Sequence, residues 1–109
     1  MSLSTHVLDA TTGRPAAGLR VHLATFTITQ DRLPLRSADT DTDGRIAELW
    51  ASNPGVYELR FDSGGYFAKH DVATFYPEVV VVFEITDPAA HHHVPLLLSP
   101  FAYSTYRGS

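Results

Sequence analysis

The side chains that could do chemistry are concentrated near the end of the chain. Residues from His92 to Ser109 include two imidazoles at the start of one expected strand, and Arg107 beside the chain's own carboxylate. Side chains after Ala102 alternate in character up to the last residue, which predicts a strand that continues to the terminus. Chain ends are usually frayed and unspecific, so ionisable groups at an ordered end suggest a site built around it. An ordinary amphipathic edge strand is the alternative.

Three consecutive histidines raise the possibility of a metal site. On a strand, His91 and His93 share one face and His92 points the opposite way. A His-x-His pair is a suitable start for a zinc or copper site, but such a site needs a third ligand. His6 or His22 could supply that ligand only if the fold brought their strands together. The alternative is a solvated strand start.

A run of aspartates imitates the opening of a calcium-binding loop. Asp39, Asp41 and Asp43 alternate and are followed by Gly44. The motif then fails, because the position that should hold a bidentate glutamate is Trp50, and no helices are expected on either side. A hairpin turn is the better interpretation.

Other common catalytic patterns are missing from the sequence. There is no Gly-x-Ser-x-Gly elbow, no phosphate-binding loop and no dinucleotide-binding glycine pattern. The absence of cysteine excludes disulfides, thiolate metal ligands and a cysteine nucleophile. His6 and Arg45 carry no weight as isolated residues, since each has an ordinary structural interpretation.

Size and composition narrow the classes of function. The 109 residues suffice for one domain, and 44% hydrophobic with 18% charged residues is typical of a folded globular chain. The formal charge of -4 argues against a nucleic-acid partner. No apolar run is long enough to span a membrane, and the first residues lack a secretory signal. We therefore expect a soluble, cytoplasmic protein, unless the sequence begins at a mature end.

The alternation of apolar and polar residues predicts a mainly β protein with eight short strands and at most one helix. The helix is expected within residues 64–71. Pro34 weakens the third strand because it removes a ladder donor. The predicted strands are residues 3–8, 19–23, 33–40, 45–50, 57–61, 79–83, 91–98 and 101–107.

The strand from Val79 to Phe83 is apolar on both faces. One face of an antiparallel sheet normally meets water. We therefore expect this strand to be covered by the core on one side and by another subunit on the other, which favours an oligomer.

Four segments, spread in order along the whole chain, carry a resemblance to a known family. They are Leu3 to Asp9, Gly13 to Ala16, Thr42 to Arg45 and Tyr106 to Ser109. Together they resemble the 5-hydroxyisourate hydrolases, the transthyretin-related proteins of purine catabolism. The terminal Tyr-Arg-Gly-Ser is the motif that separates these enzymes from the hormone-carrying transthyretins.

The resemblance implies a fold, an assembly and a reaction. The fold would be a transthyretin-like (prealbumin-like) sandwich of eight antiparallel strands and one short helix, forming a single domain over residues 1–109. The assembly would be a homotetramer, a dimer of dimers, with active sites in the channel between dimers. The reaction would be hydrolysis of 5-hydroxyisourate to 2-oxo-4-hydroxy-4-carboxy-5-ureidoimidazoline in urate catabolism, without a metal or other cofactor.

The resemblance also assigns site residues. His6, Arg45 and His93 match the family's catalytic positions. Substrate would be bound by His6, Arg45, Tyr106, Arg107, Gly108 and Ser109. Two positions depart from the family pattern: His92 stands where a tyrosine is usual and Ala102 where a glycine is usual. By strand alternation His92 points away from His93, so we expect at most a tuning effect from it.

Two other functions are compatible with the sequence. The first is a transthyretin-like carrier that holds an apolar ligand in its channel, although His6, Arg45, His93 and Arg107 are too polar for that task. The second is a sandwich that binds metal through His91 and His93. Metal analysis of the purified protein distinguishes it.

Overall fold

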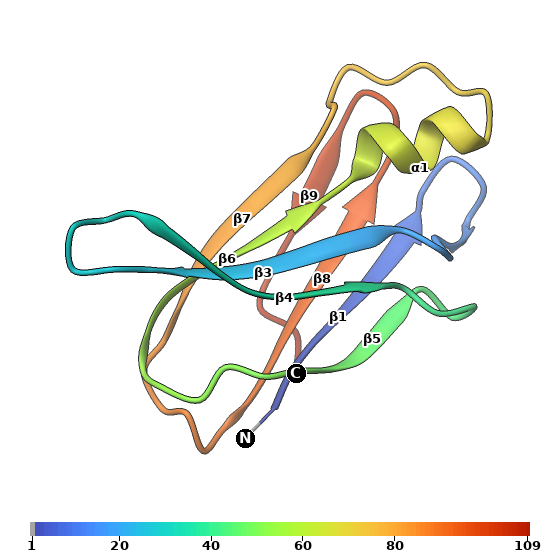
Figure 1. Ribbon diagram of the computed structural model, residues 1–109. Helices are drawn as coiled ribbons and strands as arrows, with labels where there is room; N and C mark the ends of the chain where they lie inside the picture. Colours follow the sequence, from blue (N-terminus) through green and yellow to red (C-terminus); the bar gives the residue numbers. More distant parts are fainter. Residues whose placement is uncertain (1) are drawn as a thin grey trace.

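The structure, a computed structural model, describes residues 2–109 and is a β-sandwich with one short helix (Figure 1). The predicted fold class, a mainly β sandwich with one helix, is confirmed. The elements are β1 (Ser2–Asp9), β2 (Arg14–Pro15), β3 (Arg20–Phe26), β4 (Arg32–Asp39), β5 (Arg45–Leu49), β6 (Gly55–Phe61), α1 (Ser63–Lys69), β7 (Val79–Ile85), β8 (His91–Leu98) and β9 (Tyr103–Thr105).

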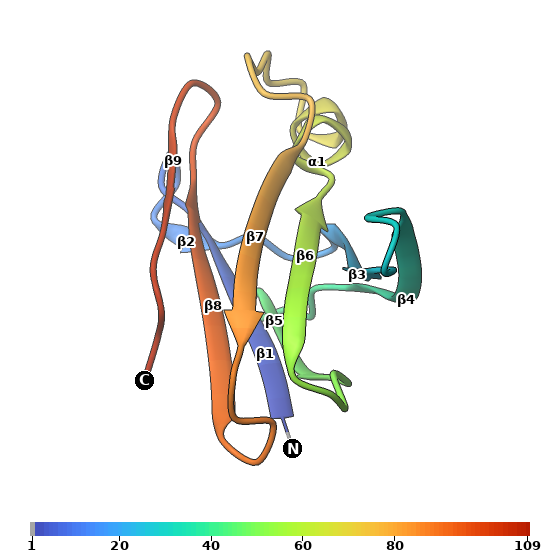
Figure 2. The same ribbon diagram turned by 90° about the vertical axis from the view of Figure 1, so that its left-hand side faces the viewer.

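The strands form two layers that face each other (Figure 2). One sheet has the order β2-β1-β8-β9, with β5 also paired to β1, and the other has the order β4-β3-β6-β7. Helix α1 lies at one end of the sandwich, and the last residues of the chain lie toward the other end. The edge strand β4 carries Pro34, whose missing N–H is tolerated there because β4 pairs only with β3.

Alternating apolar side chains from both sheets form one core. On β6, Tyr57, Leu59 and Phe61 are buried, as the sequence pattern predicts. On β8, Leu96 and Leu98 are fully buried. Complete burial of side chains of this size stabilises a fold by about 1.5–3 kcal/mol each.

Three details of the predicted strands are wrong. The two-residue strand β2 adds a ninth strand among residues 2–109. Strands β1 and β8 pair in parallel, not antiparallel. The chain enters β8 from β7, which belongs to the other sheet. The last strand ends at Thr105 instead of Arg107, and a single bridge between His93 and Gly108 continues the same register beyond it.

The outer face of β7 is uncovered in the single chain. Val79 is buried, but Val80 is 37% and Val82 58% exposed. The core thus covers one face of this strand, and the expected cover of the other face by another subunit stays a prediction. Strand β7 is also the last strand of its sheet, with an unpaired edge.

A tight turn before β5 positions Arg45. Gly44 has φ +73°, and a Cβ there would lie 2.4 Å from the carbonyl oxygen of Val7, so only glycine fits. The Asp41 carboxylate accepts hydrogen bonds from the backbone N–H groups of Asp43 and Arg45, both 2.9 Å. The aspartate run therefore forms a turn, as predicted, and Asp41 closes it.

A buried hydrogen bond joins the end of β1 to α1. Asp9 is 5% exposed and accepts from the Tyr66 hydroxyl at 2.9 Å and from the Thr11 N–H at 2.9 Å. Burial, and then the hydrogen bond to Asp9, raise the pKa of Tyr66 to about 12. The two side chains thus hold α1 against the sheet that contains β1.

Replacing Tyr66 with phenylalanine should destabilise the fold. The change removes only the hydroxyl and leaves one buried oxygen of Asp9 without its donor, which costs about 1–3 kcal/mol. Chemical denaturation should show a lower midpoint with an unchanged slope. Tyr103→Phe, at an exposed tyrosine, is the matched control and should leave the midpoint unchanged. Equal midpoints for Tyr66→Phe and the native chain would contradict this role.

Candidate active site

The register of three adjacent strands brings the predicted catalytic residues together. On β1, Leu3, Thr5 and Val7 are buried, so Ser4 and His6 point to the outer face of the sheet. In the antiparallel pairing with β5, His6 lies opposite Arg45. In the parallel pairing with β8, Ser4 lies opposite His93.

His6, Arg45 and His93 therefore share one face although they are far apart in sequence. That grouping provides two titratable nitrogens and one permanent cation around the same surface.

The hydroxyl of Ser4 forms hydrogen bonds with the rings of both His93 and His91. The Ser4 Oγ lies 2.8 Å from His93 Nδ1 and 3.2 Å from His91 Nε2. The two imidazoles stack at an interplanar angle of 17° with their centroids 6.3 Å apart. With Nδ1 engaged by Ser4, the other ring nitrogen of His93 remains for a substrate.

The surroundings of His93 favour its neutral form. Burial lowers the pKa of His93 from the ordinary value of 6.5, and the charges of His91, Arg45 and His6 lower it further. A hydrogen bond with the backbone of Ser4 raises the pKa in the opposite direction. An imidazole that is neutral near pH 7 can accept a proton, so His93 can act as a general base.

A small cavity lies beside these residues. It measures about 170 Å³ and is lined by Ser4, Thr5, Arg45, Ile46, Ala47 and His93. Arg45 is exposed, and no ion pair within residues 2–109 involves it. Its guanidinium is therefore available to a ligand, and its planar fork suits paired oxygen and nitrogen atoms on the edge of a flat molecule.

The tail of the chain, residues 103–109, packs its backbone against His93. The N–H of Gly108 donates to the carbonyl oxygen of His93 at 2.8 Å. A Cβ on Gly108 would lie 2.5 Å from the Cδ2 atom of the His93 ring. Any side chain at position 108 would displace the imidazole or the tail, so the glycine permits this close approach.

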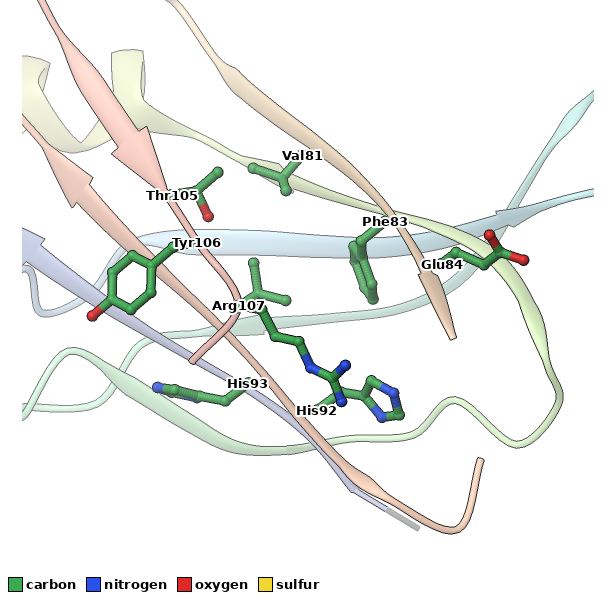
Figure 3. Close-up of a pocket in the computed structure, with 9 residues that line it drawn as sticks. Val81, Phe83, Glu84, His92, His93, Thr105, Tyr106 and Arg107 are labelled. Carbon is green, nitrogen blue, oxygen red and sulfur yellow. The ribbon is translucent and has the colours of Figure 1, made fainter. Parts of the chain in front are cut away.

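Neighbouring residues of the tail point to opposite sides of it (Figure 3). The ring of Tyr106 lies on the same side as the ring of His93. Arg107 points the other way, beside His92, into a second cavity of about 150 Å³ between the sheets. The second cavity is lined by Val81, Phe83, Glu84, His92, His93, Val94, Thr105, Tyr106 and Arg107.

The structure thus groups the predicted residues unequally. His6, Arg45 and His93 lie together, and Gly108 borders them through its contact with His93. The Arg107 side chain does not join them within one chain. His92 is 6% exposed and faces the interior, on the side of the strand opposite to His93, as alternation predicts.

Sequence reasoning missed Ser4 as a member of the site. Alternation places Ser4 on the same face as His6, but no sequence signal indicates that β1 and β8 pair with Ser4 beside His93. His91 and His93 do share a face. Within the part of the chain that the structure describes, no group of three histidine, aspartate or glutamate side chains is arranged to hold a metal ion.

The fold and the site together define a class of protein. The chain is a sandwich of two sheets, with two histidines and an arginine on the outer face of one sheet, and this sandwich is transthyretin-like. The family model described as HIUase/Transthyretin matches residues 3–108. The chain belongs to the HIUase/Transthyretin family.

Individual relatives agree with this assignment. The chain is 46% identical over 112 residues to a 5-hydroxyisourate hydrolase of Salmonella dublin, covering 98% of this chain and 80% of the relative. The solved structure of Klebsiella pneumoniae 5-hydroxyisourate hydrolase matches with a TM-score of 0.88 and 36% identity, covering 100% of both chains.

The same fold also occurs in a protein that was solved with thyroxine bound. Sea bream transthyretin in complex with thyroxine matches with a TM-score of 0.92 and 29% identity, covering 99% of this chain and 95% of that one. Since the same fold is found in a protein named as a hydrolase and in one that binds thyroxine, the function has to be argued from the side chains of the site.

Proposed function

We propose that this chain hydrolyses 5-hydroxyisourate to 2-oxo-4-hydroxy-4-carboxy-5-ureidoimidazoline, a step of urate catabolism. The relatives named 5-hydroxyisourate hydrolase support this reaction. The single observation that carries the proposal is the placement of His6, Arg45 and His93 on one face by strand register. A carrier of an apolar ligand does not require a neutral imidazole and an unpaired guanidinium in its cavity, because such cavities are lined mainly by apolar side chains.

In the proposed reaction His93 acts as the general base. It takes a proton from a water molecule while the water oxygen bonds to a carbonyl carbon of the substrate's six-membered ring. The ring C–N bond then breaks, and the departing nitrogen receives a proton. Positioned proton transfer of this kind contributes about 10²–10⁴-fold to the rate.

Arg45 and His6 act on the substrate from the neighbouring strands. The guanidinium of Arg45 can hold the negative charge that develops on the attacked carbonyl oxygen. His6, directly opposite Arg45, is close enough to the same surface to bind the ring and to exchange a proton with it. His6, Arg45 and His93 are thus the proposed catalytic residues.

The tail is proposed to bind substrate and to close the site. Support comes from the Tyr106 ring on the His93 side and from Gly108 packed on the imidazole. Ser109 follows Gly108 directly in the sequence. Arg107 is also proposed to bind substrate, although its side chain faces the second cavity within one chain.

Labelled water tests the proposed reaction. If water attacks the ring carbonyl, water enriched in heavy oxygen should place one labelled oxygen atom in the new carboxylate of the product. Mass spectrometry of product made with the protein should show this label appearing far faster than in a protein-free control. Equal rates of labelling with and without the protein would refute the proposed activity.

The rate should fall in acid, because His93 must be neutral to accept a proton. Since the pKa of His93 is held below 6.5, the neutral form dominates at pH 7 and is lost only as the pH falls through that lowered pKa. A profile of kcat/KM against pH should therefore have an acid limb centred below 6.5. A rate that rises as the pH falls through this range would show that His93 acts in its protonated form.

Hydrolysis should survive exhaustive chelation. The proposed chemistry uses only imidazole and guanidinium groups, so metal removal should leave kcat unchanged within about twofold, well below the 10²–10⁴-fold of a lost catalytic group. The comparison is between the purified protein before and after dialysis against a chelator. Activity that is lost in chelator and restored by zinc would favour metal bound at His91 and His93.

We propose that the protein assembles as a homotetramer, a dimer of dimers. Val80 and Val82 on β7 are exposed, and β7 and β9 are both unpaired sheet edges. Uncovered edges of this kind favour strand pairing between chains, which a two-fold arrangement satisfies. Light scattering should give a mass about four times the 12.0 kDa of the chain. A mass of 12.0 kDa at micromolar concentration would exclude the tetramer.

Two further predictions concern the domain organisation and the cellular location of the protein. We propose that residues 1–109 form one hydrolase domain, since buried residues of both sheets belong to a single core cluster. None of the helices within residues 2–109 has the length and apolar character needed to cross a bilayer. The cytoplasmic location stays a prediction.

A further inference from the structure

Ser4 connects two imidazoles that differ in their surroundings. His93 is half-buried beside Arg45 and His6, whereas His91 is exposed at the start of β8. Ser4 itself is 9% exposed, and its Oγ lies within hydrogen-bond distance of both rings. The hydroxyl therefore forms a continuous chain of three groups from the site to the surface.

A hydroxyl in this position can serve both tautomers of His93. It has one proton to donate and two lone pairs with which to accept. It can accept from the His93 Nδ1–H while it donates to His91 Nε2, or it can do the reverse. The two directions of the hydrogen-bond chain leave His93 Nε2 either without a proton, as a base, or with one, as an acid.

We propose that His93, Ser4 and His91 form a proton relay that serves the proposed hydrolysis. The inference rests on the proposed function. As His93 Nε2 takes a proton from water, His93 Nδ1 passes its proton to Ser4 Oγ, and Ser4 passes its own hydroxyl proton to His91 Nε2. His93 ends neutral with its tautomer reversed, and the one transferred positive charge resides on His91.

The return transfer completes the reaction. His91 gives its proton back through Ser4 to His93 Nδ1, while the Nε2 proton of His93 goes to the departing nitrogen. Protons balance: the one taken from water ends on that nitrogen, and all three side chains regain their starting state. Ser4 and His91 touch no substrate in this scheme and are positioning residues that act through His93.

The charges around His93 give a reason for the relay. Arg45 faces His93 from β5, His6 from β1 and His91 from β8, while the phenol of Tyr106 lies nearby on the tail. A positive charge on His93 would be repelled by the guanidinium of Arg45. Moving that charge to His91 relieves the repulsion, because the His91 ring centroid lies 6.3 Å from that of His93 and the His91 residue is exposed to solvent.

Three variants separate a relay from simple ring positioning. Ser4→Ala breaks the chain, and Ser4→Thr keeps the hydroxyl on a strand that tolerates β-branched residues. His91→Gln keeps a side chain able to hydrogen-bond Ser4 but cannot carry the proton. If Ser4 only orients His93, His91→Gln should lower kcat far less than Ser4→Ala does. If it relays protons, His91→Gln should be nearly as harmful as Ser4→Ala.

The readout is kcat in dilute and in concentrated imidazole buffer. In dilute buffer we expect Ser4→Ala and His91→Gln to lower kcat by about 10- to 100-fold. This loss is no larger than the loss expected when the proton-transferring group itself is removed. Concentrated imidazole should restore His91→Gln, because it can take the proton from Ser4, and should not restore Ser4→Ala. Ser4→Thr should stay near the native rate, and the double variant should match Ser4→Ala.

The relay is overturned if His91→Gln or Ser4→Ala keeps the native kcat in dilute buffer, or if added imidazole does not restore His91→Gln. Circular dichroism melts confirm that each variant is folded. The native chain is assayed alongside: if it does not hydrolyse 5-hydroxyisourate, the proposed function fails, whereas an active native chain with unaffected variants refutes the relay alone.

Discussion

Alanine in place of His93 should reduce kcat by about 10²–10⁴-fold, the range expected when a positioned proton-transferring group is removed. His6→Ala and Arg45→Ala should cause losses of similar size. Groups that act as one unit fail together, so the double variant His6→Ala/His93→Ala should be little worse than either single variant. Steady-state kinetics on freshly prepared 5-hydroxyisourate measures all of these losses.

These losses should come with little change in stability. His6, Arg45 and His93 face outward, whereas the core consists of apolar side chains between the sheets.

The matched control for the loss of kcat in His93→Ala is His92→Tyr. This variant alters the neighbouring imidazole on the opposite face, beside a cavity of about 150 Å³ that can receive the larger ring. We expect its kcat to stay within about threefold of the native value, well short of the 10²-fold loss of a catalytic group. A His92 variant as impaired as His93→Ala would mean that the wrong imidazole has been assigned.

A side chain added at Gly108 should be the most damaging single substitution in the tail. Its Cβ would lie 2.5 Å from the His93 ring, so Gly108→Ala must displace the imidazole or the tail. Displacement of a catalytic group by about 1 Å can cost about 10²-fold in rate. Kinetic assays should show this loss mainly in kcat, and deletion of Arg107 to Ser109 should reduce turnover at least as much.

The matched control for Gly108→Ala is Ser104→Ala. Ser104 is exposed on the same tail and pairs with Leu97, away from His93. It should leave kcat unchanged, while Gly108→Ala lowers it. Native turnover in Gly108→Ala or in the tail deletion would show that the tail does not close the site.

Local features of the sequence predicted much of this architecture. The period-two alternation on residues 91–98 gave both the strand and the opposite orientations of His92 and His93, because alternation is a property of each strand alone. The turn at Gly44 was likewise visible from its aspartate and glycine residues. The helix α1 falls within two residues of its predicted limits.

Features that depend on pairing between distant strands could not be read from the sequence. The parallel pairing of β1 with β8, which places Ser4 beside His93, joins residues 89 positions apart. The direction of Arg107 follows from the register of the tail on β8, and a register shift of one residue would reverse it. The contact between Gly108 and the His93 ring likewise exists only in the folded chain.

The decay of freshly made 5-hydroxyisourate, followed by its ultraviolet absorbance with and without the protein, tests the central claim most directly. The native chain should shorten this decay at catalytic concentration and through many turnovers, while His93→Ala at the same concentration should leave it close to the spontaneous rate. A native chain that leaves the decay unchanged, or a His93→Ala variant that accelerates it equally, would contradict the assignment of hydrolysis to the face that carries His6, Arg45 and His93.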